Sequence, residues 1–338
     1  MTANSAARLL QHYVDNFRSL PWRSPPGGPA PDPYQVWLSE VMLQQTTVAA
    51  VTARFTRFLE RWPTIGALAQ APDSDVLQEW AGLGYYARAR NLIACAREVV
   101  RRGGFPGTAA ELRALPGVGA YTAGAIAAIA FGENVAPVDT NVRRVTARLH
   151  GLADPAPGEI EALAHSLLPS GRAGDFVQAL MDLGATICRP RAPDCARCPL
   201  AEDCVAFKTG RPEEFPLPKA RAKRPIRHGI AFWIEREGQV WLVRRPPTGV
   251  LGGMAALPGT AWTDVPDEPR TPLGIVRHVF THFELRLGVE TRDDPVGDGW
   301  WVPIDALDSA GLPTLYRRAA ARARAERVRG LPNARATA

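Results

Sequence analysis

The chain has 338 residues, of which 46% are hydrophobic and 22% charged, a composition that excludes wholesale disorder and suggests two globular domains. Five cysteines are too few for a disulfide scaffold, and no apolar stretch is long enough to cross a bilayer. The net charge of +6 fits a polyanionic partner without identifying one. We therefore expect a protein of a reducing cytoplasm that binds no membrane.

The first 200 residues show apolar side chains at helical spacing, interrupted by glycine and proline. Apolar residues recur in this way from Leu9 to Phe17, and Pro33 can open a helix that continues as one unit through 36–55. No part of this half alternates with the period of two that a strand requires, so we expect it to be all-α. Further helical patterns cover 73–80, 86–102, 120–131, 140–150, 159–168 and 174–186.

Glu40 lies in the predicted helix that follows Pro33, and its neighbours three and four positions away are mostly apolar. A carboxyl group in such surroundings loses hydration, so we expect its pKa to rise. A carboxyl that is protonated at neutral pH can act as a general acid. The alternative is a buried glutamate satisfied by a hydrogen bond or a salt bridge.

A glycine-rich turn made of Pro116, Gly117, Val118 and Gly119 separates two helical patterns. Its glycines allow a tight turn and a close approach to another chain. The N–H groups at the start of the following helix can face a phosphate, a contact that carries no base-sequence information. A plain interhelical turn has the same composition, so both interpretations remain open.

Asp139 precedes the helical pattern at 140–150 and has the position of a helix N-cap. The functional alternative is an ionised carboxylate that stabilises developing positive charge. The two roles are compatible, because the backbone N–H groups that a cap engages favour the charged form.

Four of the five cysteines lie close together, in the spacing Cys188-x6-Cys195-x2-Cys198-x5-Cys204. Soft thiolates gathered in this way suit an iron–sulfur cluster or zinc. The single CxxC pair with wide flanks is unlike the two close pairs of the usual zinc site, which favours iron–sulfur. Zinc and four unliganded thiols remain as alternatives.

The chain changes character after the cysteines. Residues 206–227 are rich in proline and charge, which predicts an interdomain linker. Beyond it, 229–235 and 239–245 flank a predicted hairpin turn, and 277–288 alternates as a further strand. Residues 321–338 form a basic tail, for which we expect a short helix that frays.

Together these motifs resemble the helix-hairpin-helix DNA glycosylases, specifically their adenine glycosylase (MutY) branch, over 5–205 and again in the C-terminal part. The resemblance implies a multidomain protein: an all-α catalytic domain over 1–205 with a [4Fe–4S] cluster loop at 188–204, then an α+β Nudix-like domain over 228–320. It also implies a monomer, in the bacterial cytoplasm and nucleoid, that removes adenine mispaired with 8-oxoguanine or guanine in double-stranded DNA. The matching segments are LPWR (20–23), WLSEVMLQQT (37–46), GLGYYARARNL (82–92), LPGVGAYTAGAI (115–126), VDTNVRRV (138–145) and the cysteine spacing.

The resemblance gives roles to the residues of the site. Glu40 matches the general acid that protonates N7 of the flipped adenine, and Asp139 matches the carboxylate that stabilises the oxocarbenium-like sugar. Asn141 matches a further polar residue of the active site. Tyr121 stands where the bifunctional relatives of endonuclease III type have a lysine, and tyrosine forms no Schiff base, so a monofunctional enzyme is implied.

Five other residues match positions that hold the nucleic acid. Trp22, Arg23 and Gln178 match positions near the adenine pocket. Gln45 and Tyr85 match residues that fill or wedge the base stack around the mispair. The four cysteines match the ligands of the cluster.

The C-terminal part matches a domain that binds a lesion. Residues 244–259 resemble the core of a Nudix hydrolase, but 260–274 lack the glutamate pattern that binds magnesium in those enzymes, which implies recognition rather than hydrolysis. Phe280, Thr281 and His282 match the loop that contacts 8-oxoguanine. The commoner form has serine at the position of Thr281, which keeps the hydroxyl and adds a methyl group. An ordinary strand segment is the alternative for this loop.

Two other functions stay open. One is an endonuclease III-like or thymine-mismatch glycosylase, against which Tyr121 and the Nudix-like part argue. The other is a non-catalytic iron–sulfur protein that binds damaged DNA, against which the presence of both Glu40 and Asp139 argues.

Overall fold

The computed structural model describes residues 3–217, 224–267, 269 and 272–330. These residues divide into two compact units: 3–70 with 91–217, and 71–90 with the described residues from 224 onward. The sequence predicts one boundary, at 206–227, whereas the structure also joins 71–90 to the C-terminal unit. A contact inside that unit illustrates why: Gln78 Nε2 donates a hydrogen bond to Ser309 O at 2.6 Å.

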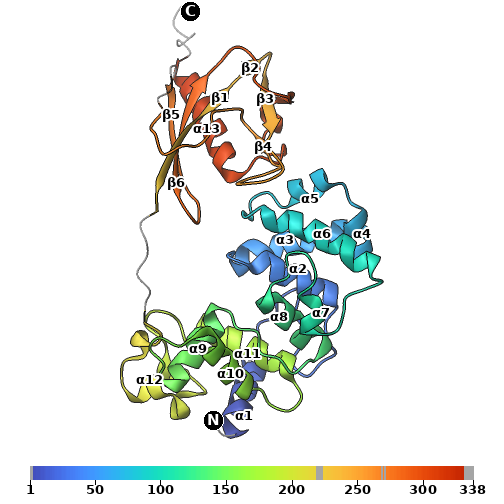
Figure 1. Ribbon diagram of the computed structural model, residues 1–338, viewed down its shortest axis with the longest axis vertical. Coiled ribbons are helices and arrows are strands. Elements are labelled where there is room, and N and C mark those ends of the chain that lie inside the picture. Colours follow the sequence, from blue (N-terminus) through green and yellow to red (C-terminus); the bar gives the residue numbers. More distant parts are fainter. Residues whose placement is uncertain (1–2, 218–223, 268, 270–271, 331–338) are drawn as a thin grey trace, which may run out of the picture. The chain divides into compact units, whose positions relative to one another are not determined.

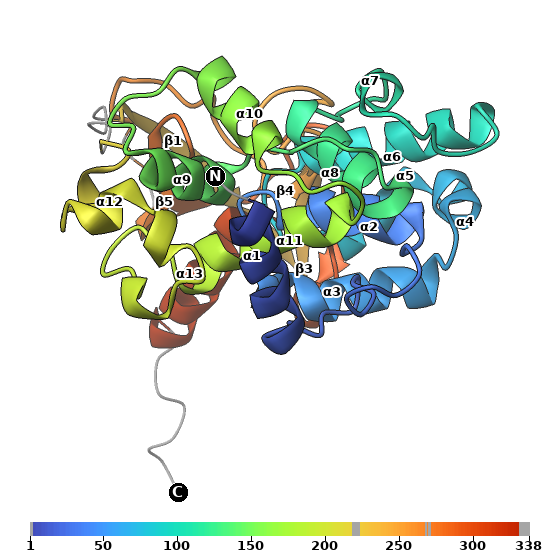
Figure 2. The same cartoon turned by 90° about the horizontal axis from the view of Figure 1, so that it is seen from below.

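The first unit is helical, and its helices form two groups (Figure 1). One group contains α2 (Pro33–Leu43), α3 (Val48–Arg61), α4 (Ile65–Gln70), most of α6 (Ala87–Arg101), α7 (Ala109–Leu112) and α8 (Ala120–Phe131). The second group contains α1 (Ala3–Asp15), α9 (Thr140–His150), α10 (Pro157–Ser166), α11 (Ala173–Thr186) and α12 (Val205–Lys208). Helix α11 packs against α1 and α9 in this second group and against α8 in the first, so it joins the two groups (Figure 2).

Local sequence explains where the helices begin and end. Asp139 caps α9, while Gly132 and Gly151, with φ of 70° and 68°, end α8 and α9 in the left-handed region that glycine accepts readily. The helices predicted at 120–131 and 140–150 are confirmed with these bounds. The sequence does not predict α4 and α7, because 6 and 4 residues are too short to show a helical period.

The prediction of one helix through 36–55 is wrong. Helix α2 ends at Leu43, and α3 begins at Val48 after an N-cap at Thr47, whose side chain accepts a hydrogen bond from the first turn. Between them Gln45 has a φ of 56°, a left-handed conformation that no α-helix continues through. Helical spacing on both sides of the break conceals it in the sequence. In the described part of the chain, no helix has the length and apolarity to cross a membrane.

The second unit contains two β-sheets together with α5 (Asp73–Glu79) and α13 (Thr314–Gly330). Helix α13 packs against β5, β6 and β1 (Figure 1). One buried core contains side chains from both sheets and from α13. In one sheet the order is β1 (Ile226–Trp233), β6 (Glu284–Thr291) and β5 (Pro272–Val279), with β1 parallel and β5 antiparallel to β6. In the other, β3 (Gln239–Arg244) pairs antiparallel with β2 (Glu235–Arg236), β4 (Ala255–Ala256) and β7 (Gly299–Pro303).

Strands occur in each region where the sequence predicts them, but the pairing of the first two and the extent of the third differ from the prediction. Only the short β2 forms a hairpin with β3, around a turn at Glu237 and Gly238 with φ of 50° and 73°, while β1 belongs to the other sheet. The predicted strand at 277–288 is two strands, β5 and β6, joined by a loop at 280–283. Alternation does not reveal this turn, because the loop contains neither glycine nor proline.

Regular structure enters the predicted linker at both ends. All of helix α12 but its first residue and a 3-10 turn at Pro212–Glu214 fall within 206–227, and the Leu217 N–H donates a hydrogen bond to Ala153 O at 2.7 Å. The last part of the predicted linker contains the start of β1. Residues 218–223 lie outside the described residues.

Helix α13 replaces part of the predicted frayed tail. It continues to Gly330, although fraying is predicted from 321. Ala323 is fully buried in the core of the second unit, and this contact explains why the helix continues. The rest of the tail, 331–338, lies outside the described residues.

Candidate active site and cysteine cluster

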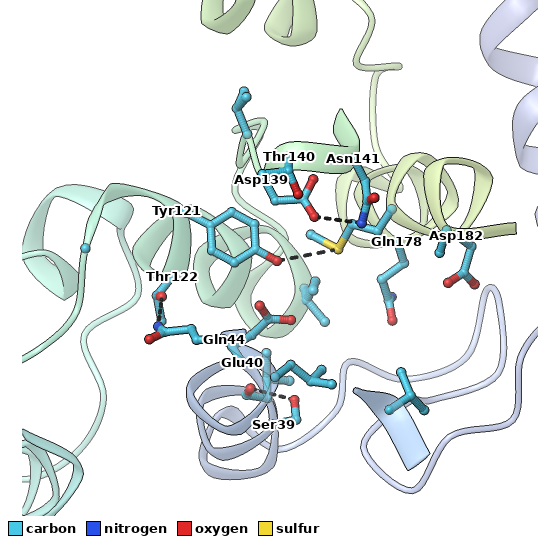
Figure 3. Close-up of a pocket in the computed structure, with 18 of the residues that line it drawn as sticks. Ser39, Glu40, Gln44, Tyr121, Thr122, Asp139, Thr140, Asn141, Gln178 and Asp182 are labelled. Carbon is cyan, nitrogen blue, oxygen red and sulfur yellow. Dashed lines mark hydrogen bonds between the residues drawn. The ribbon is translucent and has the colours of Figure 1, made fainter. Parts of the chain in front are cut away.

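A cavity of about 1020 Å³ lies in the first unit. Its walls come from α2, α8, α11, the start of α9 and the segment before α2 (Figure 3). The fold thereby brings together residues that are far apart in the chain. The predicted site residues that line the cavity are Trp22, Arg23, Glu40, Gln45, Gly117, Gly119, Tyr121, Asp139, Asn141 and Gln178.

Glu40 reaches the cavity from α2 and is only 7% exposed. Its carboxyl group points toward the hydroxyl of Tyr121 in Figure 3. Burial raises the pKa of Glu40 to about 7, while the nearby Tyr121 hydroxyl and the positive charge of Arg23 oppose the rise. A substantial fraction of Glu40 therefore carries a proton at neutral pH, in agreement with the apolar spacing around it in the sequence.

Asp139 faces the same cavity from the N-terminus of α9. One of its carboxylate oxygens accepts a hydrogen bond from Val142 N at 2.6 Å and the other from Asn141 Nδ2 at 3.0 Å. Burial raises the pKa of Asp139 above its usual value, and these hydrogen bonds oppose the rise. The N-cap pattern in the sequence predicts a backbone hydrogen bond to the Asp139 carboxylate, such as the one from Val142 N. It does not predict the burial of Asp139, which depends on the other residues that form the cavity.

Tyr121 extends from the first turn of α8, and Figure 3 shows its hydroxyl between the two carboxyl groups. Burial, followed by the negative charges of Glu40 and Asp139, raises the pKa of Tyr121 well above its usual value. The hydroxyl also lies 3.9 Å from the sulfur of Met181. Tyr121 is therefore a neutral hydrogen-bonding group at any physiological pH.

Asn141 connects Asp139 to the interior of the helical unit. Its amide oxygen accepts a hydrogen bond from Arg144 Nη2 at 2.8 Å, and the same nitrogen donates to Gly184 O at 2.7 Å. These contacts fix the Asn141 amide, so that its nitrogen faces Asp139.

Trp22, Arg23 and Gln178 form another wall of the cavity. The Trp22 ring packs edge-on against Phe55, with 5.2 Å between ring centroids. Gln178 lies on α11 and donates from its amide nitrogen to Gly174 O at 3.1 Å, which holds the side chain along the helix. Figure 3 shows it reaching into the same space as Glu40 and Asp139.

Several cavity residues escape the sequence analysis. Asp182 follows Gln178 by one helical turn on α11, and Gln44, the C-cap of α2, follows Glu40 by four positions, so their spacing from the predicted residues is the signal that finds them. Gln44 Nε2 donates to Thr122 Oγ1 at 3.2 Å. Arg18 has no such signal, because it lies in an irregular segment. Ser39, Arg143, Glu161 and Met181 are among the further lining residues.

The two predicted wedge residues share an unusual backbone. Gln45 and Tyr85 have φ of 56° and 48°, in the left-handed region that costs a residue with a side chain about 1 kcal/mol or more. Gln45 lines the cavity, whereas Tyr85 belongs to the second unit and is 46% exposed. Strain of this kind concentrates at functional sites, which supports a role for both residues without defining it.

The glycine-rich turn divides into residues that reach the cavity and residues that do not. Gly117 and Gly119 line it, whereas Pro116 and the buried Val118 do not. Gly117 has a φ of 71°, and a Cβ atom there would lie 2.5 Å from Asn91 Cβ, so the turn requires glycine. Gly119 is the N-cap of α8, and no side chain caps that helix.

The predicted lesion loop joins β5 to β6 in the second unit. The Phe280 N–H donates to Phe283 O at 2.8 Å, and the Phe280 ring packs 4.8 Å from that of Phe283. Thr281 and His282 are exposed at the tip of the loop. Within the same unit, Thr281 Oγ1 donates a hydrogen bond to the Tyr85 hydroxyl at 3.2 Å.

Cys188, Cys195, Cys198 and Cys204 line one small cavity of about 20 Å³. Arg148 Nη1 donates to Cys188 Sγ at 3.4 Å, and backbone N–H groups lie near the sulfurs of Cys198 and Cys204. Among the residues that the structure describes, no three or more His, Cys, Asp or Glu side chains form a closed metal-ligand set. The gathering of four soft donors, with N–H groups directed at sulfur, fits a thiolate-bound metal centre.

Comparison with known proteins covers both units. Residues 38–170 match the family described as HhH-GPD superfamily base excision DNA repair protein, and residues 230–322 match the NUDIX domain. Human adenine DNA glycosylase is 36% identical over 357 residues, which cover 82% of this chain and 64% of the human protein. The mouse protein of the same name is 36% identical over 352 residues, covering 82% of this chain and 68% of its own length. The chain belongs to the adenine DNA glycosylase family.

A bacterial member of the adenine DNA glycosylase family is more similar over a shorter range. The protein from Mycobacterium tuberculosis (strain ATCC 25618 / H37Rv) is 45% identical over 203 residues, covering 58% of this chain and 66% of the relative. The chain thus spans about two thirds of the length of the relatives that it matches.

Solved structures support the helical fold of this adenine DNA glycosylase family member. A thermostable thymine-DNA glycosylase has a TM-score of 0.55 and 30% identity, covering 60% of this chain and 95% of that protein. A trapped covalent intermediate of endonuclease III with DNA has a TM-score of 0.52 and 26% identity, covering 61% and 95%. The relatives in sequence carry the family assignment, because they extend over more of the chain.

Proposed function

We propose that this chain is a monofunctional adenine DNA glycosylase of base excision repair. It hydrolyses the N-glycosidic bond of adenine mispaired with 8-oxoguanine or guanine in duplex DNA, as a monomer in the bacterial cytoplasm. The observation that carries the proposal is that Glu40, Tyr121 and Asp139 line the same cavity. Membership of the adenine DNA glycosylase family supports the choice of base, and the DNA complex of endonuclease III supports the choice of partner.

Glu40 is the general acid of the proposed reaction. Adenine is a poor leaving group, and a proton placed on its N7 atom makes it a better one. The base must leave the DNA stack to reach a buried carboxyl group, and the lost stacking and pairing cost roughly a few kcal/mol. A pKa of about 7 suits this task, because the acid holds its proton at working pH and still releases it readily.

Asp139 acts on the sugar. Departure of the base leaves positive charge on the ring, which the ionised form of Asp139 stabilises until water attacks. The hydrogen bonds from Val142 N and Asn141 Nδ2 hold the carboxylate in place for this step. The division of labour between a neutral acid and an anion resembles that of the two carboxyl groups in glycosidases.

Tyr121 makes the enzyme monofunctional. A lyase step needs an amine that forms a Schiff base with the sugar, and the phenol at position 121 provides none. Its hydroxyl lies beside the Glu40 carboxyl group, which gives it another role in this proposal: to orient the acid.

The four cysteines hold a [4Fe–4S] cluster in this proposal. The cluster, when bound, would cross-link the loop at 188–204 and fix its backbone. The soft sulfur donors and the N–H groups near them support iron–sulfur, and zinc is the alternative that their chemistry also admits.

The loop at 280–282 recognises 8-oxoguanine in this proposal. Phe280 anchors the loop in the core of the second unit, and Thr281 is exposed at its tip, with its hydroxyl hydrogen-bonded to that of Tyr85. Between β4 and β5, the described residues contain no helix of the kind that binds magnesium in Nudix hydrolases. In this proposal the second unit binds the lesion and hydrolyses no nucleotide.

A gel assay tests the proposed function. Duplexes that contain A:8-oxoguanine, A:G or T:G mispairs are incubated with the protein, with and without alkali. We expect strand breaks at adenine in the first two duplexes and only after alkali, because the enzyme leaves an abasic site. Cleavage of T:G alone, or strand breakage without alkali, would identify the alternative glycosylases, and no cleavage at all would identify a non-catalytic binder.

A further inference from the structure

The wall of the active-site cavity contains an ion cluster that the proposed mechanism leaves without a role. Asp182 on α11 accepts hydrogen bonds from Arg23 Nη1 at 2.6 Å, from Arg23 Nη2 at 3.0 Å and from Arg18 Nη1 at 2.9 Å. The side chains of Arg23 and Asp182 are 8% and 13% exposed. All three residues line the cavity, and Figure 3 shows Asp182 beside Gln178.

The geometry of the cluster fixes Arg23. Two parallel N–H···O bonds between a planar guanidinium and a carboxylate hold both groups in one orientation. Arg18 binds one of the same two oxygens, so that one carboxylate holds two cations. Since burial of an unpaired charge is costly, the carboxylate is needed to keep Arg23 at this depth.

Arg23 is also the cation that acts on Glu40, since its positive charge opposes the rise of the Glu40 pKa. The other ionisable groups that face Glu40 are Tyr121 from α8 and Asp139 from the start of α9. Helix α3 packs against α2 through apolar side chains, and none of its charged residues is buried. Asp182 on α11 is therefore the group that offsets the charge of Arg23 in this cavity.

We propose that Asp182 is a positioning residue of this active site, which holds Arg23 in a fixed place beside Glu40 and offsets its charge there. The inference rests on the proposed role of Glu40 as the acid. Without the carboxylate, Arg23 loses its orientation, and its uncompensated charge favours the ionised form of Glu40. That form has no proton to give to the leaving base.

The substitution Asp182→Asn tests the inference, because it keeps the size of the side chain and removes its charge. We measure single-turnover excision on A:8-oxoguanine duplex across pH, together with duplex affinity. At pH 7 the rate constant is expected to fall at least about tenfold, and the loss of rate with rising pH is expected to begin at a lower pH. Duplex affinity is expected to change by less than about threefold, since the effect is on the chemical step. Asp182→Glu keeps the charge and is expected to restore the pH profile.

Asp175→Asn is the matched control. Asp175 lies on the same helix and pairs with Arg172 at 2.7 Å, but it does not line the cavity. Its substitution is expected to leave the rate and the pH profile unchanged. If Asp182→Asn gives the same rate and profile as Asp175→Asn, the inference is overturned.

A second variant covers the case in which Asp182→Asn does not fold. In the Arg18→Met variant, Asp182 pairs with Arg23 alone. The negative charge of Asp182 then offsets the positive charge of Arg23 beside Glu40 more fully. The loss of rate is then expected to begin at a higher pH than in the unsubstituted protein, and an unchanged profile overturns the inference. If the unsubstituted protein excises no adenine from any duplex, the proposed function itself fails, and the role of Asp182 fails with it.

Discussion

Two carboxyl groups acquire different properties here because they occupy different local structures. Glu40 lies in the middle of α2 on a buried face and meets a phenol, and burial raises its pKa to about 7. Asp139 lies at a helix terminus, where a backbone N–H and a side-chain amide donate to it. The first environment favours a proton donor, and the second provides the contacts that hold an anion.

The free energy of unfolding is expected to depend on pH because Glu40 is a buried acid. Because the pKa of Glu40 in the fold, about 7, exceeds the ordinary value of 4.5, the folded protein loses stability as pH rises through this interval. The variant Glu40→Gln lacks this loss, so at pH 8 it is expected to be more stable than the unsubstituted protein by roughly 1–3 kcal/mol. Urea denaturation of both proteins at pH 5 and pH 8 measures the difference. An equal pH dependence in the two proteins would contradict a buried, protonated Glu40.

Asp139 combines a catalytic and a structural role that two substitutions separate. Asparagine caps a helix about as well as aspartate, so Asp139→Asn is expected to abolish excision and to keep the thermal stability. Asp139→Ala is expected to abolish excision as well and to lose about 1 kcal/mol of stability with the cap. Single-turnover assays and thermal denaturation check both variants. Full activity of Asp139→Asn would contradict the proposal that the Asp139 carboxylate stabilises positive charge on the sugar.

The sequence predicts the buried helical position of Glu40 and the N-cap position of Asp139, because each carries a local signal, an apolar helical face in one case and an N-cap in the other. It does not predict Asp182, whose meaning depends on Arg18 and Arg23 folding back against α11 from a distant segment. Nor does it predict the raised pKa of Asp139, since burial at a helix terminus depends on what packs over it.

Two breaks between helices place residues at the active-site cavity. The break between α2 and α3 places Gln45 at the cavity, and the turn before α8 places Gly117 and Gly119 there. Helical periodicity predicts most of the helices around these breaks, because their buried faces are long enough to show it. It misses the break at Gln45, since neither glycine nor proline marks the left-handed conformation there.

The glycine-rich turn allows a direct test of one such interruption. Gly117→Ala places a Cβ atom 2.5 Å from Asn91 Cβ at a φ of 71°, so it is expected to cost roughly 1–3 kcal/mol of stability and to weaken duplex binding. Gly119→Ala is the control, since a Cβ atom there meets nothing within 4 Å. Thermal denaturation and gel-shift titration measure both variants. If the two substitutions have equal effects, the turn does not depend on the backbone of Gly117.

The whole molecule divides its tasks between two units. The first unit contains the cavity with both carboxyl groups and the gathering of cysteines, and the second contains the loop at 280–282. The order of motifs along the chain predicts this division. It does not predict that 71–90 joins the C-terminal unit, because that result depends on contacts between segments far apart in sequence.

The metal content of the intact protein is a property of the molecule as a whole. Protein purified without oxygen is expected to be brown and to contain about four iron atoms and no stoichiometric zinc. Replacement of Cys198 by serine is expected to lower the iron content and the thermal stability together. Elemental analysis and visible absorption measure both proteins. One zinc ion per chain, without iron, would overturn the assignment of the cluster.

The most direct test of the account is the release of free adenine from an A:8-oxoguanine duplex by the Glu40→Gln variant, measured in a single turnover beside the unsubstituted protein. We predict that the unsubstituted protein releases adenine, and that the variant binds the duplex with similar affinity but releases none. Release of adenine by the variant at a comparable rate would contradict the assignment of Glu40 as the acid.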